Sequence, residues 1–452
     1  QLNSKRLATQ PGKVALDARA AMTLVPEPGK SLASIRLEDL EAIGGELLGR
    51  SSSLARVSLP LSSLEEVTKM PGVFFVRRPH RPLLQFEGLM RVNAWLNVRQ
   101  RNVRGQKVSI AVIDFGFADA ERLRARDFPQ NRKVHDFTGS GIYSGESKHG
   151  TACTEIAYDI APDAEFHLLR INDLIDFENA KDYCLRNEID VVSFSGLWPA
   201  TGYGDGKGLA CDIVNHASDN GILWANAAGN LAQRQFEGTW RDGDEDGWHE
   251  FGPEREVLPL EEGEAGDTIV LWLTWNEWPR SQNDYDLYLC RLGNDDEVEI
   301  VAESTTTQED SSPVESIEFT VPADGVYAVM VAKSPDARPQ RFKVISGHQD
   351  VETGSLFSTI GVPGDARGAL TVGAVDAYHW LEGPLEPYSS RGATADGRLK
   401  PDLVGPTGIS TATFGRNGFN GTSGATPNVA GAAALLKSHP RIRVETNSTA
   451  PC

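Results

Sequence analysis

The chain has 452 residues, of which 40% are hydrophobic and 24% charged, and its formal net charge is −19 at pH 7. This length predicts two to three domains and enough apolar material for a large core. The acidic balance argues against a nucleic-acid partner and against binding to anionic membrane surfaces. Nowhere does the sequence approach the roughly 18–20 consecutive apolar residues of a spanning helix, so no membrane span is expected.

The N-terminal part predicts a tail over residues 1–12 and a compact α+β unit over residues 13–82. Ser62 and Glu65 form a capping-box pattern for a short helix in this unit. A basic, proline-broken stretch at Arg77–Arg81 predicts an exposed linker, and Gly88–Asn97 predicts a short amphipathic helix. The strands expected in this unit are Val14–Val25, Gly45–Gly49, Leu54–Leu59 and Val73–Arg77.

Residues 83–255 alternate short apolar runs with helical patterns. This alternation predicts an α/β fold with a parallel sheet covered by helices on both faces. The strands expected here are Val108–Ile113, Glu165–Arg170, Asp190–Phe194 and Ile222–Trp224.

Three residues of this fold have the types and the order of a nucleophilic triad. Asp114 ends an apolar strand, where open α/β sheets place functional groups, and His149 opens an apolar helix. Ser423 precedes an Ala-rich helix, where orphan N–H groups and the helix dipole favour a developing oxyanion. The order Asp, His, Ser is one of the known triad orders. Taken alone, the Ser423 stretch fits equally well a capped helix packed through small residues.

A fourth candidate follows the buried strand near residue 224. Asn230 lies in the turn that ends this segment, where its side-chain amide is placed to donate to an oxyanion.

An acidic loop follows at Arg241–Glu250. Asp242, Asp244 and Asp246, followed by a glycine, resemble the first half of a calcium-binding loop. The twelfth position is Pro253 instead of the Glu of an EF-hand, so the loop is not an EF-hand. A calcium turn of another type and a solvated acidic loop both stay open.

The pattern changes at residue 256, where short strands separated by turn residues predict an antiparallel β-sandwich over residues 256–348. The α/β pattern returns at Thr359, so the sandwich is expected as an insertion. Residues 349–440 then form the second part of the α/β domain, and residues 441–452 a polar tail. The expected strands are Thr268–Trp275, Tyr285–Leu289, Glu297–Ala302, Ser316–Val321, Gly325–Ala332 and Arg341–Ile345.

The five cysteines are widely spaced, and no pair has zinc-ligand spacing. Cys153 lies four residues after His149 and is interpreted as a small buried filler. Cys184 and Cys211 flank one predicted strand, and a disulfide between them stays open.

Three short motifs and two late segments resemble those of the subtilisin-like serine proteases, the subtilase family. They are HGTACT from His149, AAGN ending at Asn230, GTSGATPNVAG around Ser423 and the late segments PYSSRG and KPDLVGP. The chain departs from the family pattern at Gly424, Asn428 and Phe115.

The resemblance implies a subtilisin-like parallel sheet with helices on both faces, plus the inserted sandwich and the small N-terminal α+β unit. It implies a serine endopeptidase with Asp114, His149 and Ser423 as triad and Asn230 in the oxyanion hole. No cofactor is required for the chemistry, and calcium would be structural. The segment lining the substrate cleft would contribute Ser193, Phe194, Ser195, Gly196, Ala228 and Gly229.

The resemblance also extends to the flanking parts. Residues 13–82 are similar to a prosegment, which would act as an intramolecular inhibitor or folding aid, and Asn283–Leu289 resembles a jelly-roll-like module appended to secreted proteases. The chain begins at Gln1, not Met, which is compatible with removal of a leader, and a secreted or periplasmic location is expected. A peptide or protein is the expected substrate. Two alternatives stay open: a silent pseudoprotease scaffold and a peptide ligase using the same site.

Overall fold

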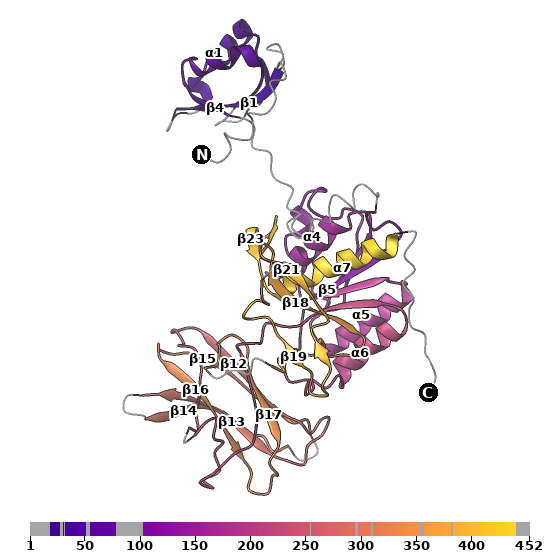
Figure 1. Ribbon diagram of the computed structural model, residues 1–452, viewed down its shortest axis with the longest axis vertical. Helices are drawn as coiled ribbons and strands as arrows, with labels where there is room; N and C mark the ends of the chain where they lie inside the picture. Colours follow the sequence, from indigo (N-terminus) through magenta and orange to yellow (C-terminus); the bar gives the residue numbers. More distant parts are fainter. Residues whose placement is uncertain are drawn as a thin grey trace. The chain divides into compact units, whose positions relative to one another are not determined.

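The computed structural model describes residues 19–27, 30, 32–50, 55–77, 103–253, 255–293, 297–308, 311–352, 357–380 and 383–439 (Figure 1). The chain divides into two compact units, residues 1–84 and 85–452. The predicted N-terminal tail, the linker after Arg77, the helix at Gly88–Asn97 and the tail at 441–452 lie outside the described residues.

The first unit is a four-stranded antiparallel sheet covered by short helices, as the α+β pattern predicts. Leu24, Leu40, Leu59 and Val67 form its core. The predicted capping box is wrong, because the chain enters α1 through a 3-10 turn and the Ser63 hydroxyl donates to the Ile43 carbonyl at 2.7 Å. The elements are β1 Arg19–Pro26, η1 Leu32–Ser34, η2 Leu37–Ile43, β2 Glu46–Arg50, β3 Ala55–Pro60, η3 Leu61–Ser63, α1 Leu64–Thr68 and β4 Val73–Arg77.

A seven-stranded parallel sheet is the centre of the second unit, with the order β21-β18-β9-β8-β5-β7-β6. Its strands are β5 Ser109–Asp114, β6 Lys133–Asp136, β7 Glu165–Arg170, β8 Val191–Phe194, β9 Leu223–Ala227, β18 Ala369–Asp376 and β21 Leu403–Thr407. The four strands expected in the first part of this domain are present, and the α/β fold class is confirmed.

Helices cover both faces of this sheet. Successive side chains of β5 point to opposite faces, and each set packs against a different pair of helices. Ile110 and Val112 pack with α4 and α7, whereas Ala111 and Ile113 pack with α5 and α6. Figure 1 shows α4 beside α7 and α5 beside α6. The helices are α4 His149–Ile160, α5 Leu174–Arg186, α6 Leu209–Asp219 and α7 Thr422–Ser438. In the part of the chain described, no helix is long and apolar enough to cross a bilayer.

Between β9 and β18 the chain forms two separate four-stranded antiparallel sheets, β10-β17-β12-β15 and β11-β16-β13-β14 (Figure 1). Both sheets contribute to one apolar core that includes Leu271, Leu287, Val329 and Phe342. This part starts earlier than the predicted residue 256, because β10 pairs with β17. The strands are β10 Gln235–Thr239, β11 Leu258–Pro259, β12 Thr268–Trp275, β13 Tyr285–Leu292, β14 Val298–Ser304, β15 Val314–Thr320, β16 Val326–Lys333 and β17 Arg341–Ser346.

The disulfide considered between Cys184 and Cys211 is not formed. Both are free and buried, on α5 and α6 respectively, and the Cys211 thiol donates to Asp365 Oδ1 at 3.3 Å. Burial keeps both thiols protonated, since it raises the pKa of each far above the usual range.

Candidate active site

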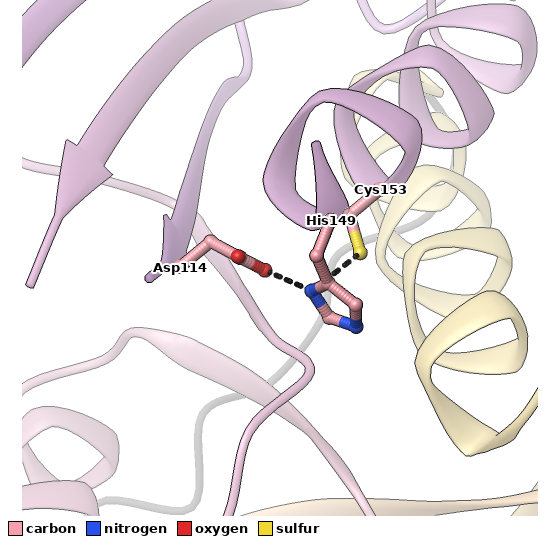
Figure 2. Close-up of side chains that lie close together, drawn as sticks. All are labelled: Asp114, His149 and Cys153. Carbon is pink, nitrogen blue, oxygen red and sulfur yellow. Dashed lines mark hydrogen bonds and ion pairs between the residues drawn. The ribbon is translucent and has the colours of Figure 1, made fainter. Parts of the chain in front are cut away.

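Asp114 ends β5 and is almost fully buried. Its Oδ1 accepts the backbone N–H of Phe115 at 2.8 Å and that of Gly116 at 3.4 Å. Its Oδ2 lies 2.7 Å from His149 Nδ1 (Figure 2). The two backbone donors therefore fix the carboxylate so that its second oxygen faces the imidazole.

His149 is the first residue of α4, and Gly150 allows this helix to approach β5 closely. A Cβ at Gly150 would lie 2.7 Å from Asp114 Cβ and 2.7 Å from the Phe117 ring. Burial disfavours the charged imidazolium, but the charge and hydrogen bond of Asp114 together with those of Cys153 outweigh burial and hold the pKa of His149 well above its usual value.

Ser423 is the second residue of α7, directly after the N-cap Gly421 and Thr422. Pro427 lies four residues further on, inside the helix, and has no N–H to donate to the Ser423 carbonyl. That carbonyl instead accepts the Ser195 hydroxyl at 3.1 Å and the Cys153 thiol at 3.7 Å. The proline thus frees the Ser423 carbonyl, which binds the side chains of Ser195, just after β8, and Cys153, on α4.

The Ser423 hydroxyl donates to the Ser195 carbonyl at 3.3 Å. Among the described residues, that carbonyl is its hydrogen-bond partner, and His149 is not. One thiol nevertheless contacts both His149 and Ser423. Cys153 Sγ lies 3.9 Å from His149 Nδ1 (Figure 2), and it lies 3.7 Å from the Ser423 carbonyl oxygen. Cys153 is fully buried, in agreement with the prediction of a buried filler.

Asn230 follows β9 after a turn in which Gly229 has a positive φ of 102°. The Asn230 Oδ1 accepts both the backbone N–H of Thr422 at 3.0 Å and its hydroxyl at 3.1 Å. The Thr422 hydroxyl also accepts the Gly229 N–H at 3.2 Å. Because Oδ1 is held in this way, the amide nitrogen of Asn230 is the group left to donate to a ligand at the start of α7. The sequence carried no signal for the role of Thr422.

The predicted substrate-binding residues differ in their surroundings. Ser193 and Phe194 are buried in β8, between β5 and β9. Ser195 follows the strand and contacts Ser423. A Cβ at Gly196 would lie within 3 Å of the rings of Phe194 and Phe115, and Ala228 and Gly229 form the turn before Asn230.

The three predicted calcium ligands lie together, since Asp242, Asp244 and Asp246 each offer an oxygen within 4.8 Å of the others. Asp242 Oδ1 is buried and has no hydrogen-bond partner among the described residues, and its Oδ2 accepts the Gly247 N–H at 3.2 Å. Carboxylate oxygens are the ligands that calcium prefers, so the donor set fits this ion.

The chain is similar to known proteins in sequence and in fold. A family model described as the Subtilase family matches residues 281–449. The CspB protease of Clostridium perfringens superposes with a TM-score of 0.52 at 17% identity, over 78% of this chain and 87% of that one. A serine protease of Aeromonas sobria has a TM-score of 0.42 at 15% identity, over 81% of this chain and 56% of its own. A lanthipeptide protease has a TM-score of 0.38 at 15% identity, over 79% of this chain and 81% of its own. The family-model match shows that residues 281–449 are similar to the subtilase family, and the chain shares its fold with the CspB protease.

Proposed function

We propose that the chain is a serine endopeptidase that hydrolyses peptide bonds through an acyl-enzyme, with Asp114, His149 and Ser423 as its triad. The observation that carries the proposal is the 2.7 Å contact between the buried Asp114 carboxylate and His149 Nδ1. This contact keeps the proton on Nδ1 and leaves Nε2 as the basic nitrogen of the neutral ring.

In the first half-reaction, His149 Nε2 takes the proton of the Ser423 hydroxyl as Oγ attacks the substrate carbonyl. The hydroxyl turns away from the Ser195 carbonyl, which is a weak neutral acceptor at 3.3 Å. Asp114 stabilises the resulting imidazolium without taking its proton. His149 then gives this proton to the leaving amine, and the acyl group remains on Ser423.

The oxyanion is stabilised by the Asn230 side-chain amide and by the Ser423 N–H. Ser423 lies in the first turn of α7, where backbone N–H groups have no partner within the helix and the dipole favours negative charge. The two bonds from Thr422 to Asn230 Oδ1 support this assignment, because they orient the amide before substrate binds. Water activated by His149 then hydrolyses the acyl-enzyme.

The proposal includes the flanking parts of the chain. The N-terminal unit acts as an intramolecular inhibitor or folding aid. Calcium bound by Asp242, Asp244 and Asp246 has a structural role. The protein works in a secreted or periplasmic compartment, which cell fractionation would test.

Labelling with a fluorophosphonate tests the proposal directly, with Ser423→Ala as control. A protease takes up one label per chain at Ser423, and the control takes up none. Absence of labelling in the wild-type chain favours a silent scaffold. Product masses in the presence of a free amine then separate hydrolysis from ligation, since a ligase transfers the acyl group to that amine.

A further inference from the structure

Glu155 is a buried carboxylate on the helix that carries His149, and the proposed chemistry does not use it. It is six residues after His149 on α4, about 9 Å along the helix axis. Its side chain is 2% exposed, and an acidic group is rarely buried to this extent without a specific partner.

The partners of Glu155 are two backbone N–H groups 257 and 258 residues away in the sequence. Its Oε1 accepts the N–H of Ala412 at 2.9 Å, and its Oε2 that of Thr413 at 3.3 Å. These residues form the tip of a hairpin between β22, Ile409–Thr411, and β23, Gly415–Phe419. One carboxylate therefore binds the tip of the hairpin to α4.

The other end of the same hairpin touches the catalytic histidine. The Phe419 ring meets the His149 ring edge to face, with centroids 5.4 Å apart, and Phe414 from the tip stacks on Phe419 at 5.3 Å. Ser423 follows Phe419 by four residues. The hairpin thus contacts α4 twice, at Glu155 and at His149, and leads directly into the turn of the nucleophile.

We propose that Glu155 is a positioning residue: its carboxylate holds the β22–β23 hairpin on α4, so that Phe419 stays against the His149 ring and the turn before Ser423 stays in register with it. Asp114 fixes the imidazole at Nδ1, and Phe419 limits rotation and tilt of the ring. The effect of Glu155 on catalysis rests on the proposed function. The anchoring of the hairpin by Glu155 does not, because it is independent of the reaction.

Glu155→Gln tests the anchor with little change of shape, since the amide keeps one acceptor and turns an NH₂ group toward the second backbone N–H. Thr154→Val is the matched control on the same helix, because the Thr154 hydroxyl donates to the Gly150 carbonyl and not to the hairpin. Hydrogen exchange of the peptide covering residues 409–419 reports the anchor, and the rate of fluorophosphonate labelling at Ser423 reports its effect on catalysis.

We expect Glu155→Gln to speed exchange in this peptide at least about 10-fold and to slow labelling about 10- to 100-fold, because small misplacements of reacting groups are costly. Thr154→Val should change neither rate more than about twofold. Unchanged exchange in a folded Glu155→Gln protein would overturn the anchor. Faster exchange with unchanged labelling would overturn the positioning role. If wild type is not labelled at all, the proposed function fails, and the exchange result still decides the anchor.

Discussion

Asp114 Oδ2 lies 2.7 Å from His149 Nδ1, and the same carboxylate receives two backbone N–H bonds through its other oxygen. Two elements fix this pair. Asp114 is the last residue of β5, and Gly150 lets α4 approach closely enough for His149 to contact it. The carboxylate held in this way contributes to raising the pKa of the His149 imidazole beside it.

Asp114→Asn should abolish most activity while leaving the fold intact. The amide cannot keep the proton on His149 Nδ1 in the productive tautomer, and an equivalent change in a comparable triad lowers kcat about 10⁴-fold. Steady-state kinetics on a peptide substrate would measure the loss, with circular dichroism as the folding control. A loss of less than 10-fold would remove Asp114 from the triad.

The pH profile of kcat/KM should rise through an ionisation above 6.5. Asp114 raises the pKa of His149 above its usual value, and only the neutral imidazole accepts a proton, so activity is low below this pKa and appears as pH increases. In Asp114→Asn the attraction is lost and burial remains, so the midpoint of the residual activity should move to lower pH. A wild-type midpoint at or below 6.5 contradicts the assignment.

Much of the α/β domain was predictable because its signals are local. The run Glu165–Arg170 has an apolar centre with Phe166, Leu168 and Leu169 and is flanked by helical patterns, and the observed β7 has these same bounds. Asp114 and His149 were likewise predictable, because each occurs at the end of an element whose period is clear in the sequence.

Contacts between distant segments were not predictable. Nothing near Gln235 indicates that β10 pairs with β17 about a hundred residues later, so the start of the antiparallel part was placed too late. The bond from Ala412 to Glu155 joins residues 257 positions apart, and a lone Glu on an apolar helix gives no sign of it. The spacing of Cys184 and Cys211 suggested a bridge, but helices α5 and α6 hold both thiols free.

Asn230→Ala should lower kcat about 10²- to 10³-fold with a smaller effect on KM, because the oxyanion develops only as the reaction proceeds. Thr422→Val tests how far the contact with Thr422 orients the Asn230 side chain, while leaving the Asn230 amide able to donate to the oxyanion. It removes one of two bonds to Asn230 Oδ1 and keeps the backbone bond at 3.0 Å, so we expect a loss of about 10-fold or less. Equal losses in the two variants would mean that Asn230 acts only through its contact with Thr422.

Calcium should raise the melting temperature through the Asp242, Asp244 and Asp246 cluster. Burial and the charges of Asp246 and Asp244 raise the pKa of nearby Glu256, which shows how concentrated the negative charge is. A ligand that binds only the native state at about 100 times its Kd stabilises it by about 2.7 kcal/mol. Calorimetry with calcium and with chelator should show this shift in wild type and lose it in Asp244→Asn. Asp219→Asn, an exposed position on α6, is the control, and equal curves with and without chelator would leave a solvated loop.

Cleavage within about residues 77–87 should increase activity, and Ser423→Ala should prevent self-cleavage there. The reason is that the strand Val73–Arg77 ends the N-terminal sheet, so an inhibitory segment continuing from it would be released once the chain is cut. Intact-mass analysis would locate the cut. The rate at which the fragment appears at several protein concentrations would give the kinetic order of the cleavage. A rate constant independent of protein concentration indicates cleavage within one chain, whereas a rate proportional to concentration indicates cleavage between chains. A chain that is fully active before any cut would make the N-terminal unit an independent domain and not an inhibitor.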